Sequence, residues 1–376
     1  MWLVLGAVLP SLLISWLAGF AVRRWAPRFG LVDHPGHRKV HKTPTPMGGG
    51  IAVWLAVVLP LAFGQLALFV IDSASAPPTS NEPSFFQPLY EIVRSHAAGL
   101  MTQAPRLWFL VGAATVLMVV GLRDDFRHIR WQIRLGIQTL VATAVVLAGW
   151  RLSVFVDAPW LLTAVSVVWI VGLINSFNML DNMDGLTAGV GTISASILAA
   201  VMLLAPDPES NQPQLFVGGF LLVLVGGLLG FLLHNRPPAR LFLGDAGSYF
   251  VGFWIAVATI MATFAGGDTP PHAVLAPLCV LSVPIYDTLT VVSIRLREGR
   301  SPFEADKNHF SHRLVELGLT KPQAVLTIYL MTATTGLGAL LLYQVDTVGA
   351  LVILTLNVCV LALVGILETA GRRRGK

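Results

Sequence analysis

Long apolar runs separated by short polar segments dominate the chain. Most of these runs approach the roughly 20 residues that a helix needs to cross about 30 Å of hydrocarbon. The pattern therefore predicts an all-α, polytopic integral membrane protein with about eleven transmembrane helices. The runs fall at about 2–22, 47–70, 107–122, 135–150, 159–176, 186–206, 214–235, 247–265, 273–294, 322–343 and 347–367.

The composition agrees with a chain that lies in a bilayer. Of the 376 residues, 55% are hydrophobic and only 12% are charged, and the mean hydropathy is +0.72. Soluble domains average roughly 25% charged residues, so an ordinary soluble protein is excluded. Residues 1–376 show no second domain and are expected to form one membrane-embedded domain. The Pro- and Ser-rich segment at about 71–106 is expected to be an outer loop.

The basic residues predict the orientation of this domain. Lys and Arg collect in cytoplasmic loops, and 22 of the 25 basic residues fall on the side of residues 23–46. The N-terminus is therefore expected outside and the C-terminus in the cytoplasm. The formal net charge of +5 follows from this asymmetry, and nothing in it indicates a nucleic-acid partner.

Five polar clusters interrupt the apolar pattern, and all of them fall on the predicted cytoplasmic side. One site at this face is therefore expected, built from the connections at 23–46, 122–134, 175–187, 235–247 and 295–321. The clusters read DHPGHRKVHKTPTPMGGG (33–50), GLRDDFRHIRWQIR (121–134), NSFNMLDNMDGLTAG (175–189), HNRPPARLFLGDAGS (234–248) and RLREGRSPFEADKNHFSHRL (295–314).

The third cluster, residues 175–189, places several Asn and Asp side chains between two long apolar runs. On a helix, Asn175, Asn178 and Asn182 share a narrow arc, while Asp181 and Asp184 widen the polar surface to about half the circumference. That width places the stretch at the membrane edge, where Gly185 lets the backbone bend. The two carboxylates suit Mg²⁺ or the donors of a ligand, and a loop with helix caps is the simpler alternative.

Two further clusters carry acids beside glycines or basic residues. Asp124 and Asp125 lie next to Arg123, as a site for Mg²⁺ and phosphates would require. Taken in isolation, such adjacent acids are more often a solvated, charge-balanced helix edge. Asp245 begins an apolar helix, whose N-terminus favours phosphate and whose carboxylate suits Mg²⁺. The alternative is that Asp245 or Ser248 simply caps that helix.

The remaining clusters are basic. His309 and His312 lack the further ligands of a zinc site and, with Arg300 and Arg313, are expected to donate to phosphate or to a sugar. Lys39 and His41 belong to a dense basic loop that suggests an anion, with a lipid headgroup as the alternative. Asp287 differs, because it lies at membrane depth and needs a partner that the sequence does not name.

Together the five motifs, in this order and at these positions, resemble the polyprenyl-phosphate N-acetylhexosamine-1-phosphate transferases (glycosyltransferase family 4). The resemblance covers roughly residues 30–325. It implies transfer of a sugar-1-phosphate from a UDP-N-acetylhexosamine to undecaprenyl phosphate with release of UMP. The enzyme would depend on Mg²⁺, with Mn²⁺ as a substitute, and act at the cytoplasmic face of the bacterial inner membrane. A homodimer is left open.

Carried over by position, the resemblance also assigns roles to residues. The catalytic acids would be Asp124, Asp125, Asp181 and Asp184, with His309 as the functional histidine; the metal would be held by Asp245, with Asp124 as a further ligand. The resemblance also places substrate contacts at Asn175, Asn178, His312 and, by a loose correspondence, Lys39. The polar clusters themselves add His41, Asn182, Arg300 and Arg313 to the expected substrate contacts. Two positions depart from the family pattern: Asn182 replaces a Gly, and Ser311 replaces the middle His of H-x-H-H.

The last cytoplasmic loop is similar to the branch that makes GlcNAc-1-phosphate carriers for O-antigen, common antigen or teichoic-acid linkage. That step would begin a cell-envelope polysaccharide pathway. One alternative is the peptidoglycan branch, which acts on UDP-MurNAc-pentapeptide. An alternative of another class is an ion-coupled transporter, although such proteins place ionisable groups near the midplane and only Asp287 approaches that depth.

Overall fold

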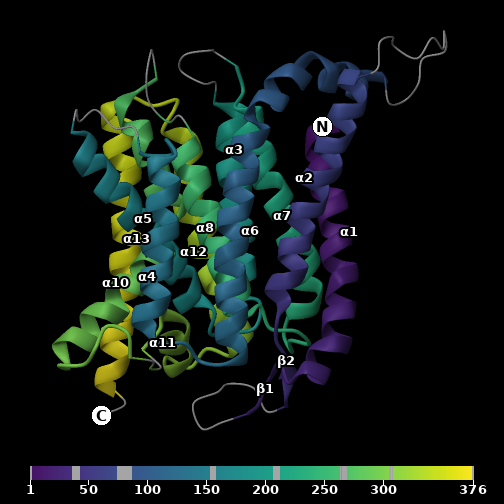
Figure 1. Cartoon of the computed structure of the whole chain (residues 1–376). Coiled ribbons are helices and arrows are strands. Elements are labelled where there is room, and N and C mark those ends of the chain that lie inside the picture. Colours follow the sequence, from purple (N-terminus) through teal and green to yellow (C-terminus); the bar gives the residue numbers. More distant parts are fainter. Residues whose placement is uncertain are drawn as a thin grey trace.

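A bundle of long helices makes up the protein (Figure 1). The computed structural model describes residues 2–35, 43–73, 87–152, 158–205, 212–262, 264, 269–304, 306 and 308–374. The first helices are α1 (Trp2–Trp25), α2 (Gly49–Ser73), α3 (Gln87–Phe126), α4 (Trp131–Leu147), α5 (Pro159–Leu180), α6 (Leu186–Leu204) and α7 (Leu215–Asn235). They are followed by α8 (Gly244–Met261), α9 (Ala276–Val280), α10 (Ser282–Arg297), α11 (Phe310–Glu316), α12 (Lys321–Leu341) and α13 (Thr347–Arg374).

The predicted all-α membrane architecture is confirmed. Within the described ranges, nine helices are long and apolar enough to cross a membrane, and the pair α9–α10 makes a tenth if it counts as one bent span. The run expected at 135–150 corresponds to α4, a shorter apolar helix of 17 residues. The remaining described elements are two 3₁₀ turns, η1 (Ala26–Phe29) and η2 (Pro271–Leu275), and an antiparallel pair of short strands, β1 (Val32–Asp33) and β2 (Thr45–Pro46).

Two elements differ from the sequence expectation. Residues 71–106 were expected to form an outer loop, but helix α3 already begins at Gln87 and runs for 40 residues. The first part of this helix is too polar for hydropathy to identify it as part of a membrane span. The run at 273–294 is broken at Leu281, where α9 and α10 meet with a 66° bend. Neither difference is visible in hydropathy, which reports apolar length but not helix continuity.

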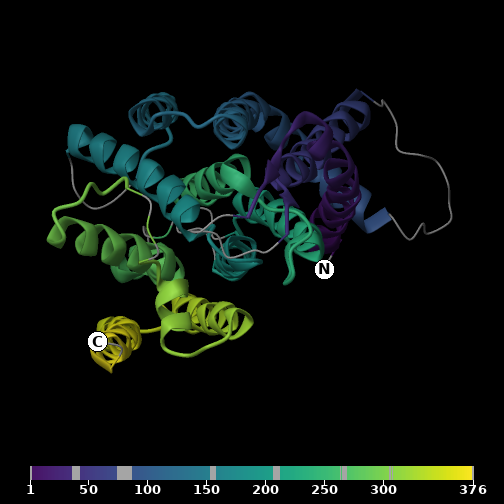
Figure 2. The same cartoon turned by 90° about the horizontal axis from the view of Figure 1, so that it is seen from below.

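Helix α8 lies at the centre of the bundle (Figures 1 and 2) and is buried along almost its whole length. Its first turn is approached very closely by neighbouring backbones. A Cβ atom on Gly50 of α2 would lie 2.2 Å from the Gly247 nitrogen, and one on Gly121 of α3 would lie 2.4 Å from the Asp245 oxygen. The glycines therefore let α2 and α3 pack directly against the N-terminus of α8, which fixes the position of Asp245.

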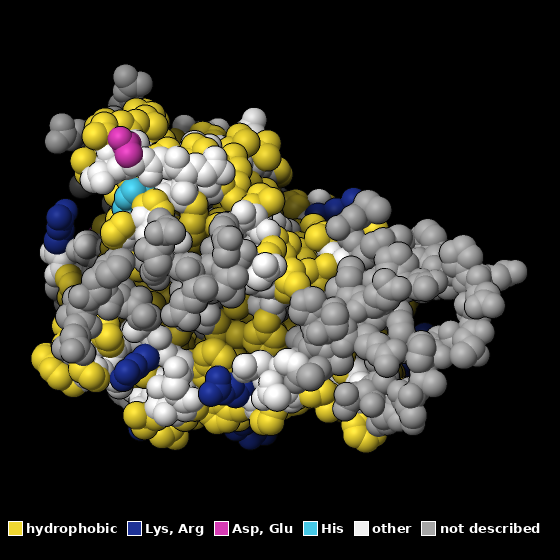
Figure 3. Space-filling model, turned by 90° about the horizontal axis from the view of Figure 1, so that it is seen from above, with side chains coloured by type: hydrophobic (Ala, Val, Ile, Leu, Met, Phe, Trp, Pro, Cys, Tyr) yellow, Lys and Arg dark blue, Asp and Glu magenta, His cyan; other side chains and the backbone are white. Residues whose placement is uncertain are grey.

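The two ends of the bundle differ in chemistry. The hairpin β1–β2, helix α11 and the end of α13 lie at one end, and the first residues of α1 lie at the other (Figure 1). The described surface of that second end is mainly apolar, with few charged side chains (Figure 3). The described parts of all five polar clusters lie at the first end, which is where the candidate site is found.

Candidate active site

The N-terminus of α8 is organised by Asp125 from α3. Gly244 adopts the left-handed region, with φ of 74°, and starts the helix. The backbone N–H groups of Asp245 and Ala246 then donate to the two carboxylate oxygens of Asp125, at 2.8 and 3.2 Å. Both free N–H groups are thereby satisfied by a residue 120 positions away. Asp125, and neither Asp245 nor Ser248, supplies the side-chain acceptor for this turn.

Asp124 is fully buried and faces Arg134 of α4. The Asp124 Oδ2 and Arg134 Nη1 atoms are 2.5 Å apart, and the Ile129 N–H donates to Oδ1. The same Nη1 lies 3.4 Å from Asp245 Oδ2 and 3.3 Å from the Tyr249 hydroxyl. Arg134 thus bridges the two acids. Arg134 was not singled out as a site residue from the sequence, although an arginine one turn inside an apolar helix signals function in a membrane protein.

The side chain of Asp245 points toward α5. Its Oδ1 accepts a 2.7 Å hydrogen bond from Asn178 Nδ2, which also donates to Ser248 at 3.1 Å. The side chain is 29% exposed, in contrast to 0% for Asp124. Of the acids bound to Arg134, Asp245 is therefore the one that a ligand can reach.

Asp181 ends α5 immediately beside this group. Burial raises the pKa of Asp181 to about 7; the charge of Asp184 adds to this rise, and the Gly244 N–H opposes it. An unperturbed aspartate titrates near 3.9. A carboxylate with so high a pKa is one that gains most from a cation placed next to it.

The turn between α5 and α6 holds the rest of the third cluster. Gly185 has φ of 78°, and its N–H donates to Asn235 Oδ1 at 2.9 Å. Its carbonyl accepts a hydrogen bond from Tyr329 of α12. Asp184 Oδ2 accepts the Ala239 N–H at 2.9 Å, which ties this turn to the segment between α7 and α8.

The three asparagines of the cluster point to different neighbours. Asn178 alone reaches Asp245. Asn175 lies one turn deeper, and its Nδ2 donates to Gln138 Oε1 of α4 at 2.7 Å. Asn182 accepts a hydrogen bond from Ser311 at the start of α11. The two positions that depart from the family pattern, Asn182 and Ser311, therefore contact each other.

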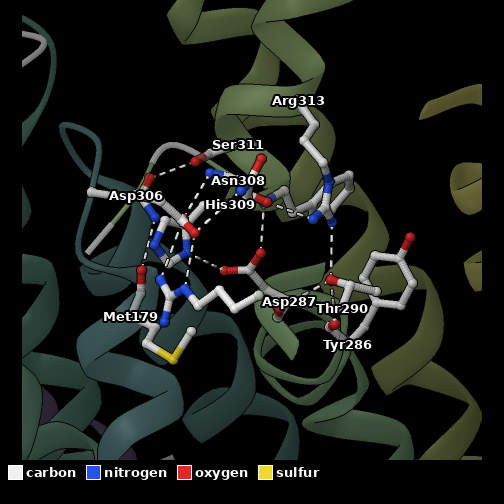
Figure 4. A network of polar contacts seen from close by, with 12 residues as sticks. Met179, Tyr286, Asp287, Thr290, Asp306, Asn308, His309, Ser311 and Arg313 are labelled. Atoms are coloured by element: carbon white, nitrogen blue, oxygen red, sulfur yellow. Dashed lines mark hydrogen bonds and ion pairs between the residues drawn. The ribbon is translucent and has the colours of Figure 1, made fainter. Parts of the chain in front are cut away.

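Asp287 finds its partner in His309 (Figure 4). The His309 Nδ1 and Asp287 Oδ2 atoms are 3.1 Å apart, and the Phe310 N–H donates to Asp287 Oδ1 at 2.6 Å. Because the carboxylate accepts from both groups, Nδ1 carries the proton and Nε2 is the remaining ring nitrogen. Asp287 thus fixes the orientation of the imidazole at the start of α11.

The arginines of the last loop are paired with acids. Arg295 donates from Nε to Asp306 Oδ2 at 2.9 Å. Arg300 lies 2.9 Å from Glu298 and 3.3 Å from Glu304. Buried Arg313 lies 3.1 Å from Glu368 of α13 and donates to Thr290 at 3.0 Å (Figure 4). Arg300 and Arg313, expected to contact substrate, thus brace the loop in this structure.

The remaining residues expected to contact substrate are His312, Lys39 and His41. The ring of His312 lies 6.4 Å from that of His309, centroid to centroid. Lys39 and His41 lie outside the described residues. The hairpin that flanks them is bonded to the segment between α7 and α8, where the Phe242 N–H donates to the Pro46 carbonyl at 2.9 Å. A cavity of about 540 Å³ opens beside this hairpin, bordered by Asp184, Phe242 and Lys321.

The acids of this site fit a magnesium ion in their chemistry. Asp124 and Asp245 contact one arginine, and Asp125 binds the turn that carries Asp245, so negative charge is in excess. Carboxylate oxygens are the ligands that Mg²⁺ prefers. Within the described ranges, no group of three or more His, Cys, Asp or Glu side chains is arranged to hold a metal by itself. Mg²⁺ in phosphate chemistry usually takes one or two carboxylates and fills its other positions with phosphate oxygens and water.

The fold and the site together describe a polytopic membrane protein with an acid-rich centre at one end of its bundle. The model of glycosyl transferase family 4 matches residues 107–263, which include Asp124, Asp181 and Asp245. A probable undecaprenyl-phosphate N-acetylglucosaminyl 1-phosphate transferase of Bacillus subtilis is 30% identical over 345 residues, covering 89% of this chain and 84% of the relative. The chain therefore belongs to glycosyl transferase family 4.

Other relatives carry similar names. A decaprenyl-phosphate N-acetylglucosaminephosphotransferase of Mycobacterium tuberculosis is 30% identical, with 88% of this chain and 80% of the relative covered. An undecaprenyl-phosphate alpha-N-acetylglucosaminyl 1-phosphate transferase of Escherichia coli K12 is 26% identical, with coverage of 84% and 77%. The family expected from the motifs is confirmed.

Proposed function

We propose that this protein transfers N-acetylglucosamine-1-phosphate from UDP-N-acetylglucosamine to undecaprenyl phosphate and releases UMP. The observation that carries the proposal is the meeting of Asp124, Asp125, Asn178, Asp181 and Asp245 around the first turn of α8. The names of the relatives from Bacillus subtilis and Escherichia coli support the sugar and the lipid carrier. The product would serve as the lipid-linked starting unit of a cell-envelope polysaccharide.

The reaction is a displacement at phosphorus. A phosphate oxygen of the lipid attacks the β-phosphorus of the donor, the bond from that phosphorus to the bridging oxygen breaks, and UMP leaves. The second pKa of a phosphate monoester is about 6, so the nucleophile is already ionised at neutral pH. The acids of the site are therefore assigned to positioning and charge control, with no proton transfer required of them.

Each residue has a separate task in this proposal. Asp245, the reachable acid, would hold Mg²⁺ together with Asp181, and the ion would offset the charge of the diphosphate. Asp125 holds the α8 turn that carries Asp245. Arg134 offsets the negative charge that develops as UMP leaves. The Nε2 atom of His309 is available to donate to a phosphate when the ring is protonated.

The two substrates would arrive from different sides. The cavity beside Asp184 is within the range of about 300–1,000 Å³ that small-molecule sites occupy, and we assign it to the soluble donor. The lipid acceptor would approach through the bilayer at the same end of the bundle. We place this end at the cytoplasmic surface of the membrane, because most basic residues of the chain lie on its connections.

The test uses the purified full-length protein in detergent with undecaprenyl phosphate, Mg²⁺ and either UDP-N-acetylglucosamine or UDP-MurNAc-pentapeptide. UMP and the lipid product are measured together. UMP release with the first donor, abolished by a chelator and restored by Mg²⁺, is expected. Release only with the pentapeptide donor would move the protein to the peptidoglycan branch, and ion-coupled uptake into proteoliposomes without UMP release would indicate a transporter.

A further inference from the structure

A second polar cavity lies at the end of α1, apart from the acids of the candidate active site. It measures about 480 Å³ and is bordered by α1, β2 and the segment between α7 and α8. Three arginines face it, Arg23, Arg24 and Arg240, and its described lining contains no acidic side chain. Arg236 borders a smaller neighbouring cavity that also includes Arg240. The end of α1 is therefore strongly positive.

These arginines differ from those of the last cytoplasmic loop. Arg295, Arg300 and Arg313 each lie within 4 Å of a carboxylate. For Arg24 and Arg240, the described part of the chain offers no such partner. Like charges gathered in one cavity repel one another, and an anion bound between them relieves that repulsion.

Arg23 is held at the cavity by a neutral side chain, which does not offset its positive charge. Its Nη1 lies 3.5 Å from Nδ1 of the buried His234, whose Nε2 lies 2.8 Å from the Trp16 carbonyl oxygen. Because a carbonyl oxygen only accepts, Nε2 carries the ring proton and Nδ1 accepts from Arg23. The ring of Phe20 packs edge-to-face on His234 at 4.7 Å between centroids. A neutral histidine therefore orients the guanidinium.

The surroundings of the cavity indicate the source of the anion. Helix α1 exposes Leu13, Leu17 and Phe20 on its outer surface immediately before the arginines. Trp25, also exposed, follows them. Apolar side chains that give way to aromatic and then basic residues mark the headgroup region of a membrane. A ligand with a phosphate in the cavity and hydrocarbon chains along α1 matches both parts of this surface.

We propose that the cavity binds the phosphodiester headgroup of an anionic phospholipid from the surrounding bilayer. Thr45 and Ala239 form a wall shared with the cavity beside Asp184, so the bound lipid would lie behind the donor cavity and brace the segments that border it. None of Asp124, Asp125, Asp181 or Asp245 lines the cavity. The site is thus distinct from the place where the acceptor phosphate must react, and it is independent of the proposed transfer reaction.

The experiment measures lipid retention directly, without catalysis. The full-length protein in nonionic detergent is titrated with phosphatidylglycerol or phosphatidylcholine, and bound lipid is counted by native mass spectrometry. Selective retention of phosphatidylglycerol is expected, weakened about tenfold or more by Arg24→Gln combined with Arg240→Gln. Arg297→Gln, which removes an exposed arginine of α10 outside the cavity, is the matched control and should retain the lipid as wild type does.

Competition separates the sources of phosphate. Excess glycerol phosphate should not displace phosphatidylglycerol, and neither should undecaprenyl phosphate at equal concentration. Displacement by the first would identify a site for soluble phosphates, and displacement by the second a site for the acceptor; either result would overturn the proposal. Equal retention by the double variant and by wild type would also overturn it, and a thermal melt of each variant verifies that the fold is intact.

Discussion

The acid cluster at α8 and the histidine cluster at α11 lie at the same end of the bundle but balance their charges differently. At α8, Asp124 and Asp245 share Arg134, Asp125 accepts two backbone N–H groups, and Asp245 remains partly exposed. At α11, Arg295 pairs with Asp306, Arg313 with Glu368 and His309 with Asp287. Charge density in the sequence therefore does not by itself identify which cluster leaves charge uncompensated. The unbalanced cluster leaves charge for a ligand to offset, whereas the ion pairs of the balanced cluster hold the loop and orient His309.

The largest effect is expected from a change at the start of α8. Gly244→Ala should lower the rate of UMP release by at least about 100-fold, because misplacing a catalytic group by about 1 Å has that effect. A Cβ atom there would lie 2.5 Å from Asp125 Oδ2, on a backbone with positive φ. Gly219→Ala on α7, where a Cβ meets nothing within 4 Å, should leave the rate unchanged. Equal rates in both variants would refute the role given to the Asp125 contact.

Removing the partner of His309 should have the next largest effect. Asp287→Asn should lower kcat about 100-fold with little change in KM, because the amide no longer fixes the ring through a charged acceptor. Steady-state kinetics on both substrates measure the split. Asp346→Asn, the same change at an exposed aspartate of the opposite end, is the control. An unchanged kcat in Asp287→Asn would show that the pair is only structural.

A smaller effect, on the free energy of unfolding, is expected from removing the ion pair between Arg295 and Asp306. Burial alone would raise the pKa of Asp306, but the hydrogen bonds from Arg295 and from the Asn308 N–H lower it to about 2. A lowered pKa stabilises the fold above the ordinary value of about 3.9, and the stabilisation is lost as the pH falls toward 2. Arg295→Gln should therefore lower the unfolding free energy at pH 7 by about 2 kcal/mol. This expected loss of stability is tested by thermal unfolding of Arg295→Gln, with Arg297→Gln as the control. Equal melting temperatures of the two variants would contradict a stabilising role of the Arg295–Asp306 pair.

The smallest effect is expected at Arg300. Its guanidinium is partly exposed and already paired with Glu298 and Glu304, and exposed ion pairs contribute less than about 1 kcal/mol. Arg300→Gln should change kcat and KM by less than about threefold. An increase in the KM for the UDP-sugar of tenfold or more would restore Arg300 to the substrate contacts that the sequence suggested.

Much of the architecture could be predicted from the sequence, and so could the position of the polar motifs at one end of the bundle. Apolar length predicts the helices because every backbone group in a bilayer must be satisfied internally. The contacts that organise the site could not be predicted from the sequence. Asp125 and Asp245 are 120 residues apart, and their pairing depends on how closely α3 and α8 pack. The bend at Leu281 and the pairing of Asp287 with His309 likewise depend on tertiary packing, which leaves no trace in local periodicity.

The role of the acid cluster at α8 is tested by comparing UMP release by wild type and by Asp245→Asn across a Mg²⁺ titration, with UDP-N-acetylglucosamine and undecaprenyl phosphate as substrates. We expect Mg²⁺-dependent release by wild type and a loss of at least about 1,000-fold in the variant, because the reachable carboxylate of the site is gone. A melting temperature equal to that of wild type verifies the fold of the variant. Undiminished release by Asp245→Asn would contradict the assignment of the reaction to the acid cluster at α8.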